Sequence, residues 1–286
     1  MATETSTAGA VRSPTTGRSE LAGIVLAAGL GTRLRPLTDL RPKALCPVGN
    51  VALVDAAIDR VGGVTGDVAV NVHAGREAME RHFPRAAPRA GVAPVQLSVE
   101  EPHVLGTAGA LGQLRWWIDG RPALVSNGDT WCPADLAGFV GRWDGERCQV
   151  LLADDPTFGP RSQLVATLLP WSVVSRLAAE PSGLYDRCLA PADAAGRLAT
   201  ARTTAPFFDC GTPASYLAAN LHVARDASIV APGATVRGPV EHSVIGEATV
   251  DGRVEHSVVW SGAEVGPSER LCHAIRTDRG TTVLAR

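Results

Sequence analysis

LAGIVLAAGLGTRLRPLTDLRPKALCPV, residues 21–48, is the stretch that decides the fold of this chain. It opens on an apolar run, residues 21–28, whose length and flanking glycines favour a short buried strand over a helix. A glycine turn, Gly29-Leu30-Gly31, follows that strand. A strand that ends in such a turn leaves several backbone N–H groups free to point at one anion, usually a phosphate. The stretch therefore predicts an α/β domain with an anion-binding turn at a strand end.

Three cationic side chains lie close to this turn. Arg33 and Arg35 follow it directly, and arginine suits bidentate contacts to phosphate. Lys43 supplies a more mobile cation. The dinucleotide-binding pattern Gly-x-Gly-x-x-Gly is incomplete, because Leu34 stands where its third glycine would fall, and the chain has no Gly-x-x-x-x-Gly-Lys-Ser/Thr loop. On the glycines alone, an ordinary turn with solvent-exposed arginines stays an open alternative.

Length and composition exclude several classes of protein. A chain of 286 residues, 45% of them hydrophobic, can form one large domain and a small appendage. The net charge of −2 and the few scattered aromatic residues argue against a nucleic-acid surface, and no apolar run is long enough to cross a membrane. The six cysteines show neither a Cys-x-x-Cys pair nor zinc spacing, which is typical of reduced thiols in the cytoplasm. Residues 1–19 lack the apolar core of a signal peptide, and we expect them to be a disordered tail.

Strands and helices are expected to alternate after the glycine turn. Asn50 is a plausible N-cap for the helix that follows it. We expect strands at 67–72, 92–99, 122–126 and 148–153, and helices at 75–83, 106–117, 133–143 and 214–224. This order implies right-handed crossovers and a mostly parallel sheet with helices on both faces. Ligands of such sheets gather at the carboxyl ends of the strands, where both the glycine turn and Asp129 fall.

The last sixty residues have a different character. The segment VRGPVEHSV at 236–244 recurs as VDGRVEHSV at 250–258. Short valine-centred strands separated by Gly and Pro predict the coils of a small parallel β-helix. His242 and His256 repeat within it, either as a metal pair or as side chains stacked at equivalent coil positions. The ends of a short stack need capping or a partner, so we expect contacts between copies of the chain, and hence a homo-oligomer.

The complete signature, residues 27–38 with 41–45, closely resembles that of the sugar-1-phosphate nucleotidyltransferases. The closest motifs are those of mannose-1-phosphate guanylyltransferase-like members. This resemblance implies a Rossmann-like (GT-A-type) catalytic domain, which we place at 20–225, and a left-handed β-helix-like extension at 226–286. It also implies that a sugar-1-phosphate attacks a nucleoside triphosphate to form an NDP-sugar and pyrophosphate. Such a site must align its substrates and neutralise crowded negative charge, and Mg²⁺ is the implied cofactor.

The resemblance assigns the two metal-binding carboxylates. Asp129, in Asn127-Gly128-Asp129, matches the first, and Asp209, in Asp-x-Gly-Thr, matches the second. Taken singly, Asn-Gly-Asp is also a good turn and Asp209 could cap the next helix. Arg33 and Lys43 would hold the triphosphate as catalytic groups together with Asp129.

The same resemblance implies the residues that bind substrate. Glu100 and the segment 105–109 resemble the loop on the nucleobase side, where Gly-Thr-Ala-Gly is typical of guanylyltransferases but also of ordinary helix starts. Asn71 and His73 could approach the base or the sugar, and a surface or helix-capping role is the alternative for His73. The residues assigned to substrate binding are Ala28, Gly29, Gly31, Thr32, Glu100, Gly106, Thr107 and Asn127.

The chain departs from the family pattern in one place. Many members carry a Glu-Lys-Pro segment that contacts the sugar, whereas this chain has Asp155-Pro156-Thr157 in that region. The identity of the sugar therefore stays open. A non-catalytic regulatory subunit that binds nucleotide sugars is the alternative function. We expect such a subunit to lose a phosphate-binding arginine or a metal aspartate, and this chain keeps them. A dinucleotide-dependent oxidoreductase is disfavoured by Leu34.

Overall fold

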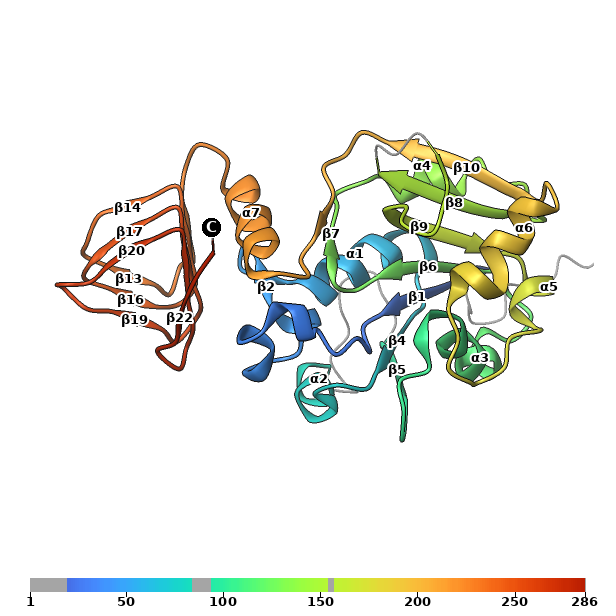
Figure 1. Cartoon of the computed structure of the whole chain (residues 1–286), viewed down its shortest axis with the longest axis horizontal. Helices are drawn as coiled ribbons and strands as arrows, with labels where there is room; N and C mark the ends of the chain where they lie inside the picture. Colours follow the sequence, from blue (N-terminus) through green and yellow to red (C-terminus); the bar gives the residue numbers. More distant parts are fainter. Residues whose placement is uncertain (1–19, 84–93, 154–156, 286) are drawn as a thin grey trace, which may run out of the picture.

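A computed structural model describes residues 20–83, 94–153 and 157–285 of the chain. The expected disordered tail at 1–19 lies outside these residues. Figure 1 shows a large α/β part and a smaller stack of short strands formed by the C-terminal residues, with helix α7 between them. No helix among the described residues is both long and apolar enough to cross a membrane.

A seven-stranded sheet forms the centre of the large part. Its strands, in spatial order, are β10 (Leu198–Thr203), β8 (Cys148–Ala153), β9 (Leu164–Leu169), β6 (Ala123–Asn127), β1 (Ala22–Leu26), β4 (Val68–Val72) and β5 (Gln96–Val99). Every pairing is parallel except the two that β9 makes with β6 and β8. The largely parallel α/β sheet is therefore confirmed. The sequence patterns gave no signal for β9 or β10.

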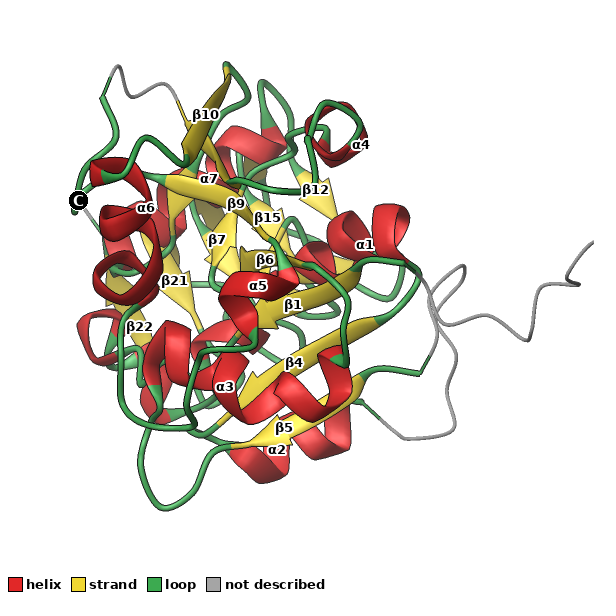
Figure 2. Ribbon diagram, turned by 90° about the vertical axis from the view of Figure 1, so that its right-hand side faces the viewer, coloured by secondary structure: helices red, strands yellow, loops and turns green. Residues whose placement is uncertain are grey.

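Helices cover both faces of this sheet (Figure 2). Successive residues of β1 alternate between the two cores, with Val25 in one and Ile24 in the other, as the period of a strand requires. One core is closed by α1 (Leu53–Thr65), α2 (Arg76–His82) and α4 (Leu136–Val140), the other by α3 (Gly106–Ile118), α5 (Trp171–Val174), the π-helical turn η4 (Tyr185–Leu189) and α6 (Ala190–Ala194).

Two expected helix starts are wrong. Asn50 does not cap α1: Gly49 and Asn50 both have positive φ and form the two-residue turn of a hairpin between β2 (Pro47–Val48) and β3 (Val51–Ala52). Pro133 does not begin a helix either, because α4 starts later, where the Asp135 carboxylate accepts hydrogen bonds from two N–H groups of its first turn.

Three glycines on one side of α3 explain its packing. A Cβ atom would lie 2.6 Å from the Ser182 carbonyl oxygen at Gly106, 2.2 Å from the Glu180 carbonyl oxygen at Gly109 and 2.1 Å from the Ala178 carbonyl oxygen at Gly112. The backbone of 178–182 therefore lies directly on this helix. This close packing accounts for the glycines of the Gly-Thr-Ala-Gly pattern without any contact to a nucleobase.

The C-terminal residues form three short parallel sheets (Figure 1). Each turn of the chain adds one strand to each sheet, and the two copies of the sequence repeat lie in register, Val240 with Val254 and Val244 with Val258. The sheets are β12 (Ile229–Val230), β15 (Val244–Ile245), β18 (Val258–Val259), β21 (Ala274–Arg276) and the antiparallel β22 (Thr282–Leu284); β13 (Thr235–Val236), β16 (Thr249–Val250) and β19 (Glu264–Val265); and β14 (Val240–Glu241), β17 (Arg253–Glu255) and β20 (Arg270–Cys272).

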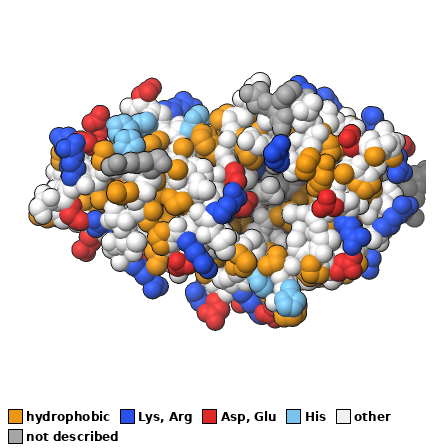
Figure 3. All heavy atoms as spheres, in the orientation of Figure 1, with side chains coloured by type: hydrophobic (Ala, Val, Ile, Leu, Met, Phe, Trp, Pro, Cys, Tyr) orange, Lys and Arg blue, Asp and Glu red, His pale blue; other side chains and the backbone are white. Residues whose placement is uncertain are grey.

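Histidine side chains gather on one corner of this stack (Figure 3). The rings of His242 and His256 lie 5.1 Å apart, and His273 continues the row, 5.1 Å from His256 and parallel to it. The sequence repeat showed only the first two. The His242 and His256 rings meet edge to face at 77°, and only the His256 and His273 rings are stacked. No group of three or more metal-ligating side chains occurs in the part of the chain that the structure describes.

The C-terminal coils share a hydrophobic core with the large part. That core joins Leu53 of α1 and Tyr216 of α7 (Pro213–Ala224) to Val244, Trp260 and Ile275 of the coils. Its buried polar contacts are also shared, because the Trp260 indole N–H donates to the Tyr216 hydroxyl at 3.0 Å. That hydroxyl in turn donates to the Pro47 carbonyl.

Candidate active site

A small antiparallel pair of strands brings the two candidate metal ligands together. Asp129 lies in the turn between β6 and β7 (Thr130–Trp131), at the carboxyl edge of the sheet. Strand β11 (Phe208–Asp209) pairs with β7 so that Asp209 faces Thr130, the residue after Asp129. Two aspartates eighty residues apart in the sequence thereby become neighbours, as the resemblance required.

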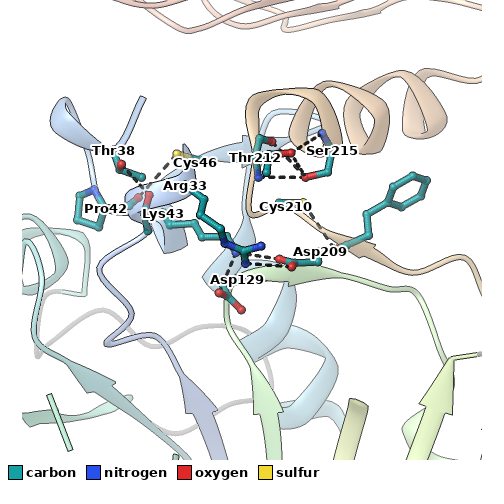
Figure 4. Close-up of polar contacts among 12 residues, drawn as sticks. Arg33, Thr38, Pro42, Lys43, Cys46, Asp129, Asp209, Cys210, Thr212 and Ser215 are labelled. Carbon is teal, nitrogen blue, oxygen red and sulfur yellow. Dashed lines mark hydrogen bonds and ion pairs between the residues drawn. The ribbon is translucent and has the colours of Figure 1, made fainter. Parts of the chain in front are cut away.

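A single ammonium group joins the two carboxylates (Figure 4). The Lys43 Nζ atom lies 2.9 Å from Asp129 Oδ2 and 3.1 Å from Asp209 Oδ1. The lysine side chain is only 7% exposed, whereas the carboxylates are 38% and 48% exposed. The two carboxylates therefore contact a buried ammonium group on one side and are open to solvent on the other.

Arg33 approaches the same cluster from the glycine turn. One of its terminal nitrogens lies 3.4 Å from Asp209 Oδ2, and its side chain is 70% exposed. The guanidinium lies close to Gly211, where a Cβ would be 2.9 Å from that arginine nitrogen. Figure 4 shows the ends of both side chains at this cluster: Arg33 contacts Asp209, and Lys43 contacts both Asp209 and Asp129. The long, exposed contact leaves the guanidinium free to bind an anion.

Electrostatics keep Lys43 charged and the neighbouring thiols neutral. Burial alone would lower the pKa of Lys43, but the attraction and hydrogen bonds of Asp129, and then of Asp209, outweigh it and raise the pKa. Burial also raises the pKa of Cys210, next to Asp209, and of Cys46 to about 12 each. At neutral pH these thiols are not nucleophiles.

The glycine turn presents open backbone at the same edge. Gly31 has φ +62°, and the Thr38 hydroxyl holds the turn by donating to the Gly31 carbonyl at 2.9 Å. No atom of the described residues lies within 4 Å of the position a Cβ would take at Gly29, and Leu30 is exposed. Among the described residues, none accepts a hydrogen bond from the N–H groups of Gly29, Leu30 and Gly31. An anion can therefore approach them.

A buried polar chain lies beside this turn. The Asn71 side chain accepts from the Ala27 N–H at 2.7 Å and donates to Glu100 Oε1 at 2.8 Å. The other oxygen of Glu100 accepts from the Leu105 N–H at 2.7 Å, and Glu100 is fully buried. The chain ties the end of β1 to β4, β5 and the start of α3. Glu100 therefore fixes the positions of these elements and is not accessible from solvent.

Three other residues assigned to substrate binding have internal contacts. Gly106 packs on Ser182, and the Thr107 hydroxyl accepts from the Leu184 N–H at 2.7 Å. Asn127 ends β6, half-buried and in register with Leu26. Ala28 is buried beside the glycine turn and Thr32 is exposed at its end. The structure therefore brings Arg33, Lys43, Asp129 and Asp209 into contact, and buries Glu100, whereas Gly106 is half-buried and Thr107 is exposed.

The role of Asn71 as the centre of the buried chain was missed in the sequence. The signal was an amide inside the otherwise apolar strand Val68–Val72, since a buried amide requires partners. His73 accompanies it, with Nδ1 2.9 Å from the Glu100 carbonyl oxygen. The place of the Glu-Lys-Pro segment falls partly on 154–156, outside the described residues.

The carboxylate pair is chemically suited to a magnesium ion. Mg²⁺ takes oxygen ligands and typically uses one or two carboxylates together with phosphate oxygens. Asp129 and Asp209 offer two half-exposed carboxylates close enough to share one ammonium group. The donor set fits, and a bound triphosphate would complete it.

The fold and this cluster place a charged strand edge beside an open glycine turn. Residues 22–153 match the family model described as nucleotidyl transferase. An N-acetylmuramate alpha-1-phosphate uridylyltransferase of Caulobacter vibrioides is 39% identical over 135 residues, 45% of this chain and 55% of that protein. A mannose-1-phosphate guanyltransferase of Neurospora crassa is 35% identical over 123 residues, 41% of this chain and 33% of that protein.

These matches cover parts of the proteins concerned. The chain spans about half the length of the Caulobacter protein and a third of the Neurospora protein. Among solved structures, a putative glucose-1-phosphate thymidylyltransferase from Bacillus anthracis, in complex with a sucrose, aligns with a TM-score of 0.58 and 23% identity. The alignment covers 72% of this chain and 96% of that one, and it supports the fold.

Proposed function

We propose that this protein is a sugar-1-phosphate nucleotidyltransferase, which joins a sugar-1-phosphate to a nucleoside triphosphate and releases pyrophosphate. The observation that carries the proposal is the contact of Asp129 and Asp209 with one Lys43 ammonium, directly beside Arg33 and the open glycine turn. Two half-exposed acids and two cations at one strand edge suit a triphosphate and its metal ion. A regulatory subunit without activity would not need all four.

The position of each residue at this strand edge indicates its role in the proposed reaction. The N–H groups at Gly29, Gly31 and Thr32 would receive phosphate oxygens, while Arg33 neutralises charge that develops on the pyrophosphate leaving group. Asp129 and Asp209 would hold Mg²⁺. That ion, when bound, supplies charge neutralisation and alignment of the phosphates. The sugar phosphate oxygen attacks the α-phosphorus in line and needs no general base, so Lys43 serves as a cation.

The substrate pair is the finer part of the proposal. The signature favours GTP with mannose-1-phosphate or a related sugar, and the Neurospora relative bears such a name. The Caulobacter relative is named for a uridylyl transfer to N-acetylmuramate alpha-1-phosphate, which makes UTP with that sugar phosphate the second pair to test. The internal contacts of Gly106 and Thr107 remove one reason for preferring guanine.

A pyrophosphate-release assay tests the activity. The full-length protein is incubated with Mg²⁺, each common nucleoside triphosphate and a panel of sugar-1-phosphates. We expect release only when Mg²⁺, one triphosphate and one sugar phosphate are present together, and none from Asp209→Asn. Absence of release from every pair, or equal release from Asp209→Asn, would overturn the proposal.

We also propose that residues 20–225 form the catalytic unit and that 226–286 are a short left-handed β-helix that joins copies of the chain. The edge strands of the three C-terminal sheets support this, since such edges favour pairing with another chain. Light scattering of the purified protein should give the mass of a dimer or larger assembly. A monomer mass at micromolar concentration would exclude this role. A cytoplasmic location stays a prediction.

A further inference from the structure

Lys43 lies against both carboxylates that are proposed to hold the metal ion. Its ammonium contacts one oxygen of each aspartate. An ammonium and a divalent cation repel each other, so a metal ion binds these carboxylates less tightly while the ammonium stays between them. The acids therefore have an internal cation with which any metal ion must compete.

Lys43 is also the only lysine in the chain, since the other 26 of its 27 lysine and arginine residues are arginine. The two residues differ in shape. An ammonium is a compact point charge on a flexible four-carbon stem, whereas a guanidinium is a rigid planar fork. A compact cation fits between two carboxylates and can leave by rotating its stem. Lysine is therefore the side chain better suited to a buried cation that exchanges one set of partners for another.

The surroundings of Lys43 show where it would move. A Cβ at Gly31 would lie 3.1 Å from the Lys43 Cβ, so the stem of the lysine starts beside the glycine turn. The turn carries the exposed N–H groups proposed to receive the phosphates. A triphosphate bound there would attract the ammonium away from the aspartates without movement of the backbone.

We propose that Lys43 is an exchangeable internal cation, which neutralises Asp129 and Asp209 in the free protein and passes to the phosphates when nucleotide and metal bind together. The proposal rests on the proposed function for its nucleotide. It follows that the metal ion alone binds weakly and that the triphosphate strengthens metal binding. Coupling between two ligands of one protein typically amounts to about 5–150-fold.

The first experiment removes the internal cation and measures metal binding without nucleotide. Mn²⁺ alone is titrated into the full-length protein and followed by electron paramagnetic resonance. Lys43→Met keeps the stem and removes the charge, and it should bind Mn²⁺ at least tenfold more tightly than the natural protein. Arg35→Met is the matched control, because Arg35 belongs to the same turn but pairs with Asp39, and its Mn²⁺ affinity should stay within twofold.

Equal Mn²⁺ affinity in the natural protein and Lys43→Met would overturn the proposal. An affinity gain cannot result from misfolding, since unfolded chains lack the paired carboxylates. Lys43→Met combined with Asp129→Asn should lose the gain, and a gain that persists would place the metal elsewhere and also overturn it. Because no turnover is measured, this result is independent of whether the protein makes an NDP-sugar.

The second experiment uses the natural protein. With one lysine in the chain, ε-¹³C-lysine labelling gives a single side-chain signal in nuclear magnetic resonance. Mg²⁺ alone at millimolar concentration should leave this signal in place, and Mg²⁺ with GTP or UTP should shift it. A signal that Mg²⁺ alone shifts fully, or that stays in place after calorimetry has shown nucleotide binding, contradicts the exchange. Failure of both nucleotides to bind contradicts the proposed function and leaves the Mn²⁺ result to decide the exchange.

Discussion

Two groups of acidic and polar side chains lie at the same edge of the sheet and differ in solvent exposure and in hydrogen-bond partners. Asp129 and Asp209 are half-exposed, charged and held by one buried ammonium. Asn71 and Glu100, a few strands away, are buried, and their side chains hydrogen bond to one another and to the backbone. The comparison teaches that an acid at a strand end can either meet a substrate or fix the shape of the edge. Solvent access decides between the two.

The largest effects are expected where the exposed cluster loses a charge. Asp129→Asn and Arg33→Ala should each reduce turnover at least about a hundredfold, as is typical for a lost electrostatic contact in an active site. Because the Arg33 side chain is 70% exposed, Arg33→Ala should change the free energy of unfolding by less than about 1 kcal/mol. Asp129→Asn should cost more stability, since it removes one of the two carboxylates that compensate the buried Lys43 ammonium. Steady-state kinetics and denaturant titrations measure the two quantities. Near-normal turnover in both variants would refute the assignment of the cluster.

Asn71→Ala should show the opposite balance. The substitution leaves the Ala27 N–H and Glu100 Oε1 without their partner, and each unsatisfied buried group costs about 1–3 kcal/mol. We expect a loss of stability of that order for each group, and a smaller loss of turnover, about tenfold or less, since no charge at the cluster changes. A stability within error of the natural protein would show that solvent reaches this chain.

Glu100→Gln should have a smaller effect of the same kind. The amide keeps one acceptor oxygen, so it can satisfy either the Asn71 amide or the Leu105 N–H, but not both. One lost hydrogen bond should cost about 1–3 kcal/mol of stability. Thermal unfolding measures it. If instead the variant lost a hundredfold in turnover at full stability, Glu100 would belong with the exposed acids.

The smallest effect concerns the thiols and tests how deep solvent reaches at the cluster. Cys46 and Cys210 are buried near Lys43, and only Cys272 of the six cysteines is exposed. A disulfide reagent at pH 8 should therefore modify one thiol per native chain and leave activity unchanged. All six should react in denaturant. Rapid reaction of a second thiol with loss of activity would mean that the edge opens below the aspartates.

Much of this architecture follows from local patterns in the sequence. The strand at Ala22–Leu26 and its glycine turn could be predicted because a short apolar run bounded by glycines is typical of a buried strand that ends in a turn. The antiparallel strands β7 and β11, which bring Asp209 to Asp129, could not, because two-residue strands carry no periodic signal. Their neighbourhood was inferred from the family resemblance.

The different roles of Lys43 and Glu100 could not be predicted either. Both were assigned to ligands by the family resemblance, which gives no information on burial. Their burial depends on neighbours distant in the sequence, Asp209 for Lys43 and the segment around Leu105 for Glu100. Asn50 failed as a helix cap for a related reason, since its side chain donates to the Ile245 carbonyl of the C-terminal coils.

The contact between the C-terminal strands and the large α/β part has a consequence for how the protein unfolds. Trp260 lies under the Arg41 guanidinium at 4.0 Å and donates to Tyr216, and these two partners belong to the segments that carry Lys43 and follow Asp209. Because the two parts share one hydrophobic core, we expect a single melting transition for both. A protein cut after Ala224 would expose Tyr216 and its apolar neighbours to water, so we expect the charged edge to lose stability when the last sixty residues are removed.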